Sequence, residues 1–286
     1  MTDGAWKQRR KSVFVTGAAR GIGRETARQL VAAGYDVALV DLLADEVEEA
    51  AAALGERAFP LVADVTDQAS LDDAAAQAAR RFGGIDAAVA NAGIADLSPI
   101  LGGDRARQQR MLDINLGGVL DTLRATAPYV IERRGYLLSI ASAAAISHLP
   151  LLGVYGATKA GVEALSDSLR IELRSRGVQV GVGYFLLIKT PLLDGPGSEL
   201  LPVLERGLGW PMNRRIPVER AGQAIVAGIE RRSRRVYAPG LVGPMLPLRQ
   251  LLAPVIEQQM RLTGVVRKVE QLDARVEQPL DHTRAG

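Results

Sequence analysis

The feature that most constrains the fold is a regular alternation of short apolar runs with longer amphipathic segments. The apolar runs are too short for helices, so we interpret them as buried strands. They span residues 13–15, 37–40, 58–63, 87–90, 136–140, 178–187 and 235–237. The segments between them carry apolar residues at helical spacing and predict helices. These helices span residues 22–33, 44–54, 70–82, 105–132, 155–176 and 218–232, with Ser70 as the N-cap of the third.

Continuous apolar strands that alternate with helices predict a parallel sheet covered by helices on both faces. The expected fold class is therefore a doubly wound α/β domain with a sheet of about seven strands. We divide the chain into an N-terminal tail (1–10), one main domain (11–239) and a C-terminal extension (240–286). Within the main domain, residues 191–217 are rich in Pro and Gly and predict a long loop that serves as a lid. The first part of the extension is apolar and interrupted by prolines.

Composition excludes several kinds of chemistry. The chain has no cysteine and only two histidines, His148 and His282. Disulfides, thiolate zinc sites and cysteine nucleophiles are therefore excluded, and a metal centre or a Ser-His-Asp hydrolase has little to build on. The net charge of +3 is too small to indicate a nucleic-acid partner.

A glycine-rich run lies between the first predicted strand and the first predicted helix. Residues 16–23 read Thr-Gly-Ala-Ala-Arg-Gly-Ile-Gly, with glycines at Gly17, Gly21 and Gly23. Glycine allows a tight turn and lets a pyrophosphate approach backbone amides at a helix N-terminus. Asp41 ends the second strand, which strengthens a dinucleotide-binding interpretation over that of a plain structural turn.

Four polar residues beyond the fourth predicted strand are candidates for catalysis. Tyr155 and Lys159 are four residues apart, so they share one helix face, and an ammonium there would lower the pKa of the tyrosine. Such a tyrosine can act as an acid or base. Ser142 follows the fifth strand, at the end of the sheet where doubly wound folds bind ligands. Asn115 lies inside a predicted helix, an unusual place for Asn unless its side chain has a role.

Together these motifs, in this order and spacing, resemble the short-chain dehydrogenase/reductase (SDR) family, and the resemblance covers residues 11–239. It implies a Rossmann-like fold, with Tyr155 as general acid/base and Ser142 holding the substrate oxygen. Lys159 would bind the ribose and lower the tyrosine pKa, and Asn115 would join a water-mediated proton relay. The cofactor contacts that the resemblance and the loop chemistry imply are Gly17, Arg20, Gly21, Ile22, Gly23, Asp41, Asp64, Val65, Asn91, Ala92, Gly93, Tyr155, Lys159, Ile188 and Thr190.

The sequence departs from the family pattern after the sixth strand. The family usually has Pro-Gly there, followed by a threonine that contacts the nicotinamide amide. This chain has Phe185-Leu186, although Ile188 and Thr190 remain in place. The departure puts the shape of the pocket in doubt, not the cofactor.

The implied function is an NAD(P)-dependent oxidoreductase that interconverts an alcohol and a carbonyl. Asp41 can accept hydrogen bonds from both ribose hydroxyls of NAD and would repel the phosphate of NADP, whereas Arg20 could attract that phosphate. We expect NAD to be preferred, with NADP possible. A cofactor-binding sensor or structural protein on the same fold is the alternative.

The substrate is less constrained. The lid segment contains many apolar side chains, which favour a bulky hydrophobic alcohol or ketone unless they only pack the lid against the body. They are Leu192, Leu193, Leu200, Leu201, Val203, Leu204, Leu208, Trp210 and Met212. His148 either lines this pocket or is a plain loop residue.

The resemblance also implies a homodimer or homotetramer, and an apolar part of the extension would support such assembly, pack over the active site or lie on a membrane surface. Its residues are Leu246, Leu248, Leu251, Leu252, Val255 and Ile256. No targeting or transmembrane segment stands out, so we expect a cytoplasmic protein. The arginine-rich run 231–235 has two interpretations, a contact for an acidic partner and the solvated end of a helix.

Overall fold

The structure is a computed structural model that describes residues 10–273. Within this range, seven parallel strands form one sheet in the order β3-β2-β1-β4-β5-β6-β7. They are β1 Ser12–Thr16, β2 Asp36–Asp41, β3 Ala58–Val62, β4 Ala87–Ala90, β5 Tyr136–Ile140, β6 Gln179–Phe185 and β7 Arg235–Ala238. The predicted doubly wound sheet is confirmed. From β1, the strands are added first toward one edge of the sheet, as β2 and β3, and then toward the other edge, as β4 to β7. Ligands bind at such a switch point, which here lies between β1 and β4.

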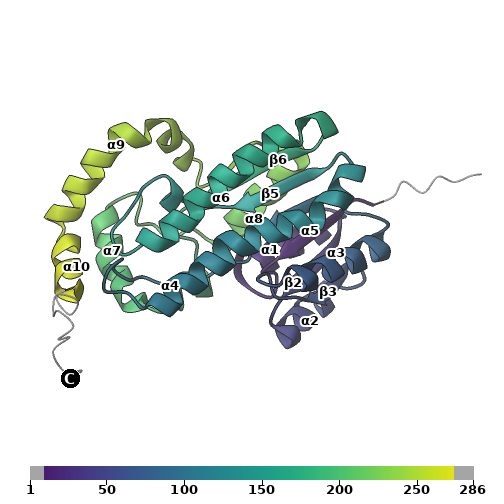
Figure 1. The fold of residues 1–286 in the computed structure, drawn as a ribbon, viewed down its shortest axis with the longest axis horizontal. Helices are drawn as coiled ribbons and strands as arrows, with labels where there is room; N and C mark the ends of the chain where they lie inside the picture. The colour runs from purple at the N-terminus through teal and green to yellow at the C-terminus, as the bar shows by residue number, and fades with distance from the viewer. Residues whose placement is uncertain (1–9, 274–286) are drawn as a thin grey trace, which may run out of the picture.

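Helices cover both faces of the sheet (Figure 1). One face packs against α3 (Gln68–Phe82), α5 (Gly118–Glu132) and α6 (Gly153–Glu172). The other packs against α1 (Gly21–Ala32), α2 (Ala44–Ala52) and α8 (Val218–Arg231). Successive strand residues point to opposite faces, so Phe14 enters one core and Val13 and Val15 enter the other. Strands buried on both faces therefore have to be apolar throughout.

Two helices differ from the sequence prediction. The helix expected from Ser70 begins at Gln68, and Asp67 is its N-cap, accepting a hydrogen bond from the Ala69 amide at 3.0 Å. Ser70 instead accepts a hydrogen bond from the Asp64 amide. Both residue types cap helices well, so local preference alone could not choose between them.

The helix expected over residues 105–132 is divided in the structure. It consists of α4 (Arg105–Leu112), a π-helical turn (Asp113–Gly117) and α5. Asn115 lies inside the π turn. A π turn adds one residue to the helical repeat, and such turns often occur at functional sites.

Part of the chain after β6 packs around a separate apolar cluster beside the sheet (Figure 1). It contains α7 (Leu201–Leu208), and beyond β7 the chain continues as α9 (Val242–Leu262) and α10 (Val265–Asp273). We expected the prolines to break this extension, but Pro247 and Pro254 both lie inside α9. Figure 1 shows α9 as a curved arch that reaches from the body to α7. Proline removes one backbone hydrogen bond and bends a helix, which accounts for the curve.

Within residues 10–273, no helix combines the length and the apolar character needed to cross a bilayer. Most of the N-terminal tail and residues 274–286 of the extension lie outside the described residues.

Candidate active site

One cavity of about 540 Å³ opens at the carboxyl end of the sheet. It runs from the glycine-rich loop after β1, past the ends of β2 to β6, to the lid around α7. The strands are parallel, so the loops that follow them meet at one edge, and residues far apart in sequence line one space.

The glycine-rich loop closes one end of this cavity. Gly17 and Gly21 have φ angles of +66° and +57°, a conformation that favours glycine. A side chain on Gly17 would lie 2.8 Å from the Ala92 Cα, and one on Gly23 would collide with the Gly17 carbonyl oxygen. Gly23 itself does not line the cavity but lets α1 approach the loop. No side chain caps the start of α1, and its first turn has no acidic residue, so its amides can receive an anion.

Asp41 lies at the end of β2 and lines the cavity. Its carboxylate accepts hydrogen bonds from the Ala19 amide at 3.0 Å and the Leu43 amide at 3.2 Å. Arg20 also lines the cavity and is exposed, and in the described part of the chain it forms no ion pair with Asp41. The carboxylate thus keeps a negative charge at this edge that Arg20 does not neutralise.

The loop after β3 forms the next part of the wall. Asp64 accepts hydrogen bonds from the amide and hydroxyl of Thr66, and the amide bond is the main cause that lowers the pKa of Asp64. Asp64 and Val65 both line the cavity. A side chain on Gly118 would lie 2.7 Å from the Val65 Cγ2, so this glycine lets α5 pack closely against the loop.

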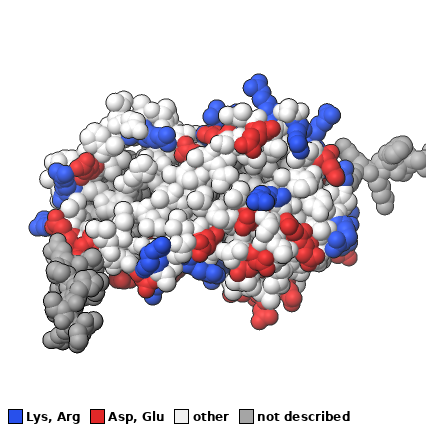
Figure 2. Space-filling view, in the orientation of Figure 1, with Lys and Arg blue, Asp and Glu red and all other residues white. Residues whose placement is uncertain are grey.

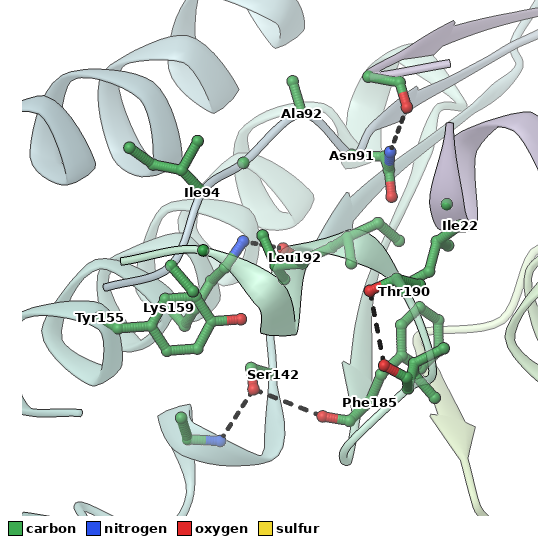
Figure 3. Close-up of a pocket in the computed structure, with 18 of the residues that line it drawn as sticks. Ile22, Asn91, Ala92, Ile94, Ser142, Tyr155, Lys159, Phe185, Thr190 and Leu192 are labelled. Atoms are coloured by element: carbon green, nitrogen blue, oxygen red, sulfur yellow. Dashed lines mark hydrogen bonds between the residues drawn. The ribbon is translucent and has the colours of Figure 1, made fainter. Parts of the chain in front are cut away.

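Asn91 joins the ends of β4 and β1. Its Nδ2 donates to the carbonyl oxygens of Thr16 at 2.9 Å and Gly17 at 3.2 Å. Figure 3 draws one of these two hydrogen bonds. The two bonds hold the glycine-rich loop against the segment Asn91-Ala92-Gly93, whose three residues all line the cavity.

Ser142, Tyr155 and Lys159 face the same part of the cavity (Figure 3). Ser142 follows β5, and its Oγ accepts from the Ala144 amide at 3.1 Å and donates to the Phe185 carbonyl at 3.4 Å. Tyr155 lies in the first turn of α6. Lys159, one turn later, has its Nζ 5.8 Å from the centre of the Tyr155 ring and donates to the Ile140 carbonyl at 2.9 Å.

Burial controls the charges of this group. It raises the pKa of Tyr155, and a hydrogen bond with Ser142 acts in the opposite direction. We expected Lys159 to lower that pKa, but in the structure desolvation of the phenolate dominates. Burial also lowers the pKa of Lys159 to about 8. Near neutral pH, Tyr155 is therefore protonated and Lys159 is mostly cationic.

Asn115 lies behind the wall of the cavity and does not line it. It is fully buried, and its side chain forms hydrogen bonds with the amide and carbonyl of Ile94, at 2.8 and 2.9 Å, and with Thr158 Oγ1 at 3.3 Å. A side chain on Gly93 would lie 3.1 Å from Asn115 Oδ1 and 3.5 Å from Lys159 Nζ. The Asn115 side chain thus fixes the loop after β4 beside Lys159.

The segment after β6 forms the opposite wall. Phe185, which replaces the expected proline, is buried, and its ring packs near Gly183, where a side chain would lie 3.3 Å from the Phe185 Cζ. Leu186, Ile188 and Thr190 line the cavity, and a side chain on Gly21 would lie 3.5 Å from the Thr190 Cγ2. Phe185 therefore packs in the core and also forms part of the cavity wall, beside Leu186.

The lid contributes part of its predicted apolar set. Leu192, Leu201, Leu204, Leu208 and Met212 line the cavity, and Leu200 and Val203 pack in the adjoining cluster. Trp210 is 80% exposed and does not line it, and the side chain of Leu193 lies outside the described ones. His148 is exposed, as expected of a plain loop residue.

Further lining residues were not among the sequence candidates. They include Ile94, Ala95, Leu97, Arg110, Ile114, Ala144, Ser147, Leu149 and Leu152. Most of them follow a predicted motif by a few residues, so their nearness to a motif was a signal that they would line the cavity. Apolar residues in a loop have no sequence pattern of their own that would indicate this. In residues 10–273, no group of three or more His, Asp or Glu side chains could hold a metal ion.

This cavity at the switch point of a doubly wound sheet defines a dinucleotide-binding α/β protein. A family model described as short chain dehydrogenase matches residues 11–197. The chain belongs to that family, which confirms the resemblance read from its motifs, and it is an oxidoreductase of the SDR type.

The chain is also similar to a protein compared by sequence and to two proteins of known structure. The chain is 39% identical over 172 residues to a sorbitol dehydrogenase of Cereibacter sphaeroides, covering 59% of this chain and 67% of that protein. An alcohol dehydrogenase of the archaeon Thermococcus sibiricus, solved with 5-hydroxy-NADP, has a TM-score of 0.69 at 25% identity and covers 79% of this chain and 94% of its own. An SDR protein of Burkholderia phymatum, solved with NAD, has a TM-score of 0.76 at 20% identity, covering 87% and 95%, and shows the fold alone.

Proposed function

We propose that the protein interconverts an alcohol and a ketone, using NAD in preference to NADP, with Tyr155 as the general acid and base. One observation carries this proposal: Ser142, Tyr155 and Lys159 share a cavity with the uncapped start of α1 and with Asp41. A binding site for a dinucleotide and a proton-transfer group thus lie in one continuous space.

The residues present fit a nicotinamide dinucleotide. The left-handed glycines would leave room for a pyrophosphate beside the amides of α1, and Asp41, which lines the same cavity, would accept hydrogen bonds from the adenosine ribose. Asp64 and Val65 would flank the adenine, Lys159 the second ribose, and Ile188 and Thr190 the nicotinamide. When bound, the nicotinamide accepts or supplies a hydride.

Proton transfer falls to the chain's own groups. In the reductive direction, the Tyr155 hydroxyl donates a proton to the substrate oxygen, which Ser142 holds by a hydrogen bond. In the oxidative direction, the phenolate takes the hydroxyl proton. Because burial keeps Tyr155 protonated near neutral pH, the site is prepared for carbonyl reduction there. Lys159 supplies a nearby positive charge that stabilises the phenolate when it forms.

A hydrophobic substrate is the class that the wall chemistry favours. Beyond Tyr155, the cavity is lined mainly by leucines of the lid and of the loop after Ser142, among them Leu149, Leu152 and Leu204. Its charged lining residues are Arg20, Asp41, Asp64, Arg110 and Lys159, and the part formed by α7 contributes none. An uncharged, bulky ketone or alcohol would bury apolar surface there without leaving a charge unpaired.

Turnover of a substrate panel tests the proposal. Hydrophobic cyclic ketones and small polar sugars are offered with NADH, and the nicotinamide absorbance is followed. We expect oxidation of NADH with the ketones, at a kcat/KM about tenfold or more above that for sugars, because a mismatched polar group loses more than 1.4 kcal/mol in an apolar pocket. If NADH binds but no member of the panel turns over, the protein is a cofactor-binding sensor instead. A preference for sugars would contradict the hydrophobic class alone. A homo-oligomeric, cytoplasmic enzyme remains our prediction.

A further inference from the structure

A second cavity, of about 350 Å³, lies at the other end of the sheet. It is formed by the end of α6, the first residues of β6 and the turn between α8 and β7. Strand β6 begins at this cavity and ends at the proposed active site, so the length of the strand separates the two. The cavity is therefore a distinct feature of the fold.

Four of the eight residues that line this cavity are arginines, namely Arg170, Arg174, Arg232 and Arg234. Arg170 and Arg174 lie one helical turn apart at the end of α6, and the other two come from the run 231–235 after α8. Gly177, with a φ of +75°, turns the chain between the two sets. At the edge where Figure 1 places the end of α6, Figure 2 shows several Lys and Arg side chains, with Asp and Glu side chains beside them.

In the described part of the chain, Asp167 is the carboxylate that pairs with the arginines of this cavity. Asp167 is shared by three guanidinium groups: Arg235 binds it at 3.0 and 2.6 Å, and Arg234 and Arg170 lie at 3.6 and 3.7 Å. Among the residues that the structure describes, Arg174 and Arg232 form no ion pair, although Arg232 donates a hydrogen bond to the Arg134 carbonyl at 2.9 Å. The 3.7 Å contact of Arg170 with Asp167 is made by its buried Nε and is too long for a hydrogen bond. The cavity therefore has an excess of positive charge.

We propose that this arginine pocket binds a small, multiply charged oxyanion of the diphosphate type. A guanidinium group is planar and presents its N–H donors side by side, so it can bind two phosphate oxygens through a pair of hydrogen bonds. Four lining arginines against one shared carboxylate match a ligand with two or more negative charges. The volume of the pocket suits one or two phosphate groups, and the buried side chains of Val178 and Val180 form an apolar floor.

Pyrophosphate binding to the full-length protein tests this proposal. Titration calorimetry is run at low salt with saturating NADH present, which occupies the glycine-rich loop. The double variant Arg174→Gln/Arg232→Gln removes two lining charges. The matched variant Arg176→Gln/Arg231→Gln removes two exposed charges from the same segments, outside the pocket. Both lose the same net charge, so general surface electrostatics changes equally.

We expect one pyrophosphate site, weakened about tenfold or more by the lining pair and less than about twofold by the matched pair, because only the first removes charge-assisted hydrogen bonds. Turnover of the ketone substrate should be unchanged in both variants. Equal weakening in the two pairs, or the absence of binding at millimolar pyrophosphate, would overturn the proposal. Loss of binding in Arg20→Gln alone would show that pyrophosphate occupies the glycine-rich loop, which would also overturn it.

Discussion

Asp41 has two roles at the end of β2. Its carboxylate fixes the amides of Ala19 and Leu43, and the same group faces the cavity where an adenosine ribose would lie. Since Arg20 leaves its charge unpaired, Asp41 would repel a phosphate on that ribose. Two unit charges about 4 Å apart repel by ~4 kcal/mol at an effective dielectric of 20, and solvent at this partly exposed edge reduces that value.

Asp41→Asn should therefore lower the NAD-over-NADP ratio of kcat/KM by about tenfold or more, because it removes the charge and keeps the size of the side chain. The measurement is the pair of steady-state constants for each cofactor. Asp45→Asn, on an exposed residue outside the cavity, removes the same charge and should leave the ratio unchanged. An unchanged ratio in Asp41→Asn would mean that another residue controls cofactor choice.

The Ser142 hydroxyl influences the proton held by Tyr155. Its hydrogen bond lowers the pKa of Tyr155, whereas burial raises it. Ser142→Ala should therefore raise that pKa further and shift the pH-dependent rise of alcohol oxidation to higher pH, since oxidation requires the phenolate. The measurement is kcat/KM for oxidation from about pH 7 to 11, a range that extends above the ordinary tyrosine pKa of about 10. Ser147→Ala, which removes another hydroxyl from the cavity wall, is the control and should not move the curve. A shift to lower pH would contradict this assignment.

Sequence patterns predicted the site residues better than their surroundings. Asn91 and Ser142 each follow a strand, so the topology alone brings them to one edge of the sheet. The π turn at Asn115 could not be predicted, because one extra residue in a turn hardly changes the apolar spacing. Trp210 was expected among the lid residues, but hydrophobicity does not decide which apolar side chains of a loop turn inward.

At the scale of elements, α9 and α10 support the lid. Met260 on α9 and Val265 on α10 pack in one cluster with Leu201 and Leu204, which line the cavity from α7. A side chain on Gly207 would lie 2.8 Å from the Met260 sulfur, so α7 and α9 are in close contact. The described part of the extension thus forms the outer backing of the proposed substrate pocket.

Met260→Ala should lower the free energy of unfolding by about 2–5 kcal/mol, as expected for truncating a buried methionine. It should also raise KM for hydrophobic ketones more than it changes KM for NADH, because Leu204 loses its support. Denaturant unfolding and steady-state kinetics measure the two effects. Leu262→Ala, on the same helix but 74% exposed, is the matched control and should change neither. Equal effects of the two substitutions would show that α9 does not hold the lid.

At the scale of the whole molecule, a single chain leaves apolar side chains of α9 and α6 exposed to solvent. Of the apolar residues of the extension, Leu246 and Ile256 pack against the protein, whereas Leu248, Leu251 and Val255 are exposed on α9. Ile171 on α6 is 67% exposed as well. A second copy of the chain covering such surface would remove it from water.

Light scattering at micromolar concentration should accordingly give a mass of at least twice one chain, as a homodimer or homotetramer requires. Leu251→Asp/Val255→Asp should lower the mass if α9 contributes to the interface, because a buried charge opposes association. A mass of one chain for the unchanged protein would contradict the prediction of an oligomer.

The central claim is that Tyr155 transfers the proton in a nicotinamide-dependent reaction, and Tyr155→Phe tests it most directly. The variant keeps the ring and removes the hydroxyl. Single-turnover oxidation of NADH by a ketone substrate is measured beside NADH binding followed by fluorescence. We predict that the rate falls by a factor of about 10²–10⁴, the usual contribution of a general acid, while NADH binding is largely kept. A rate close to that of the unchanged protein, with NADH binding intact, would contradict the account.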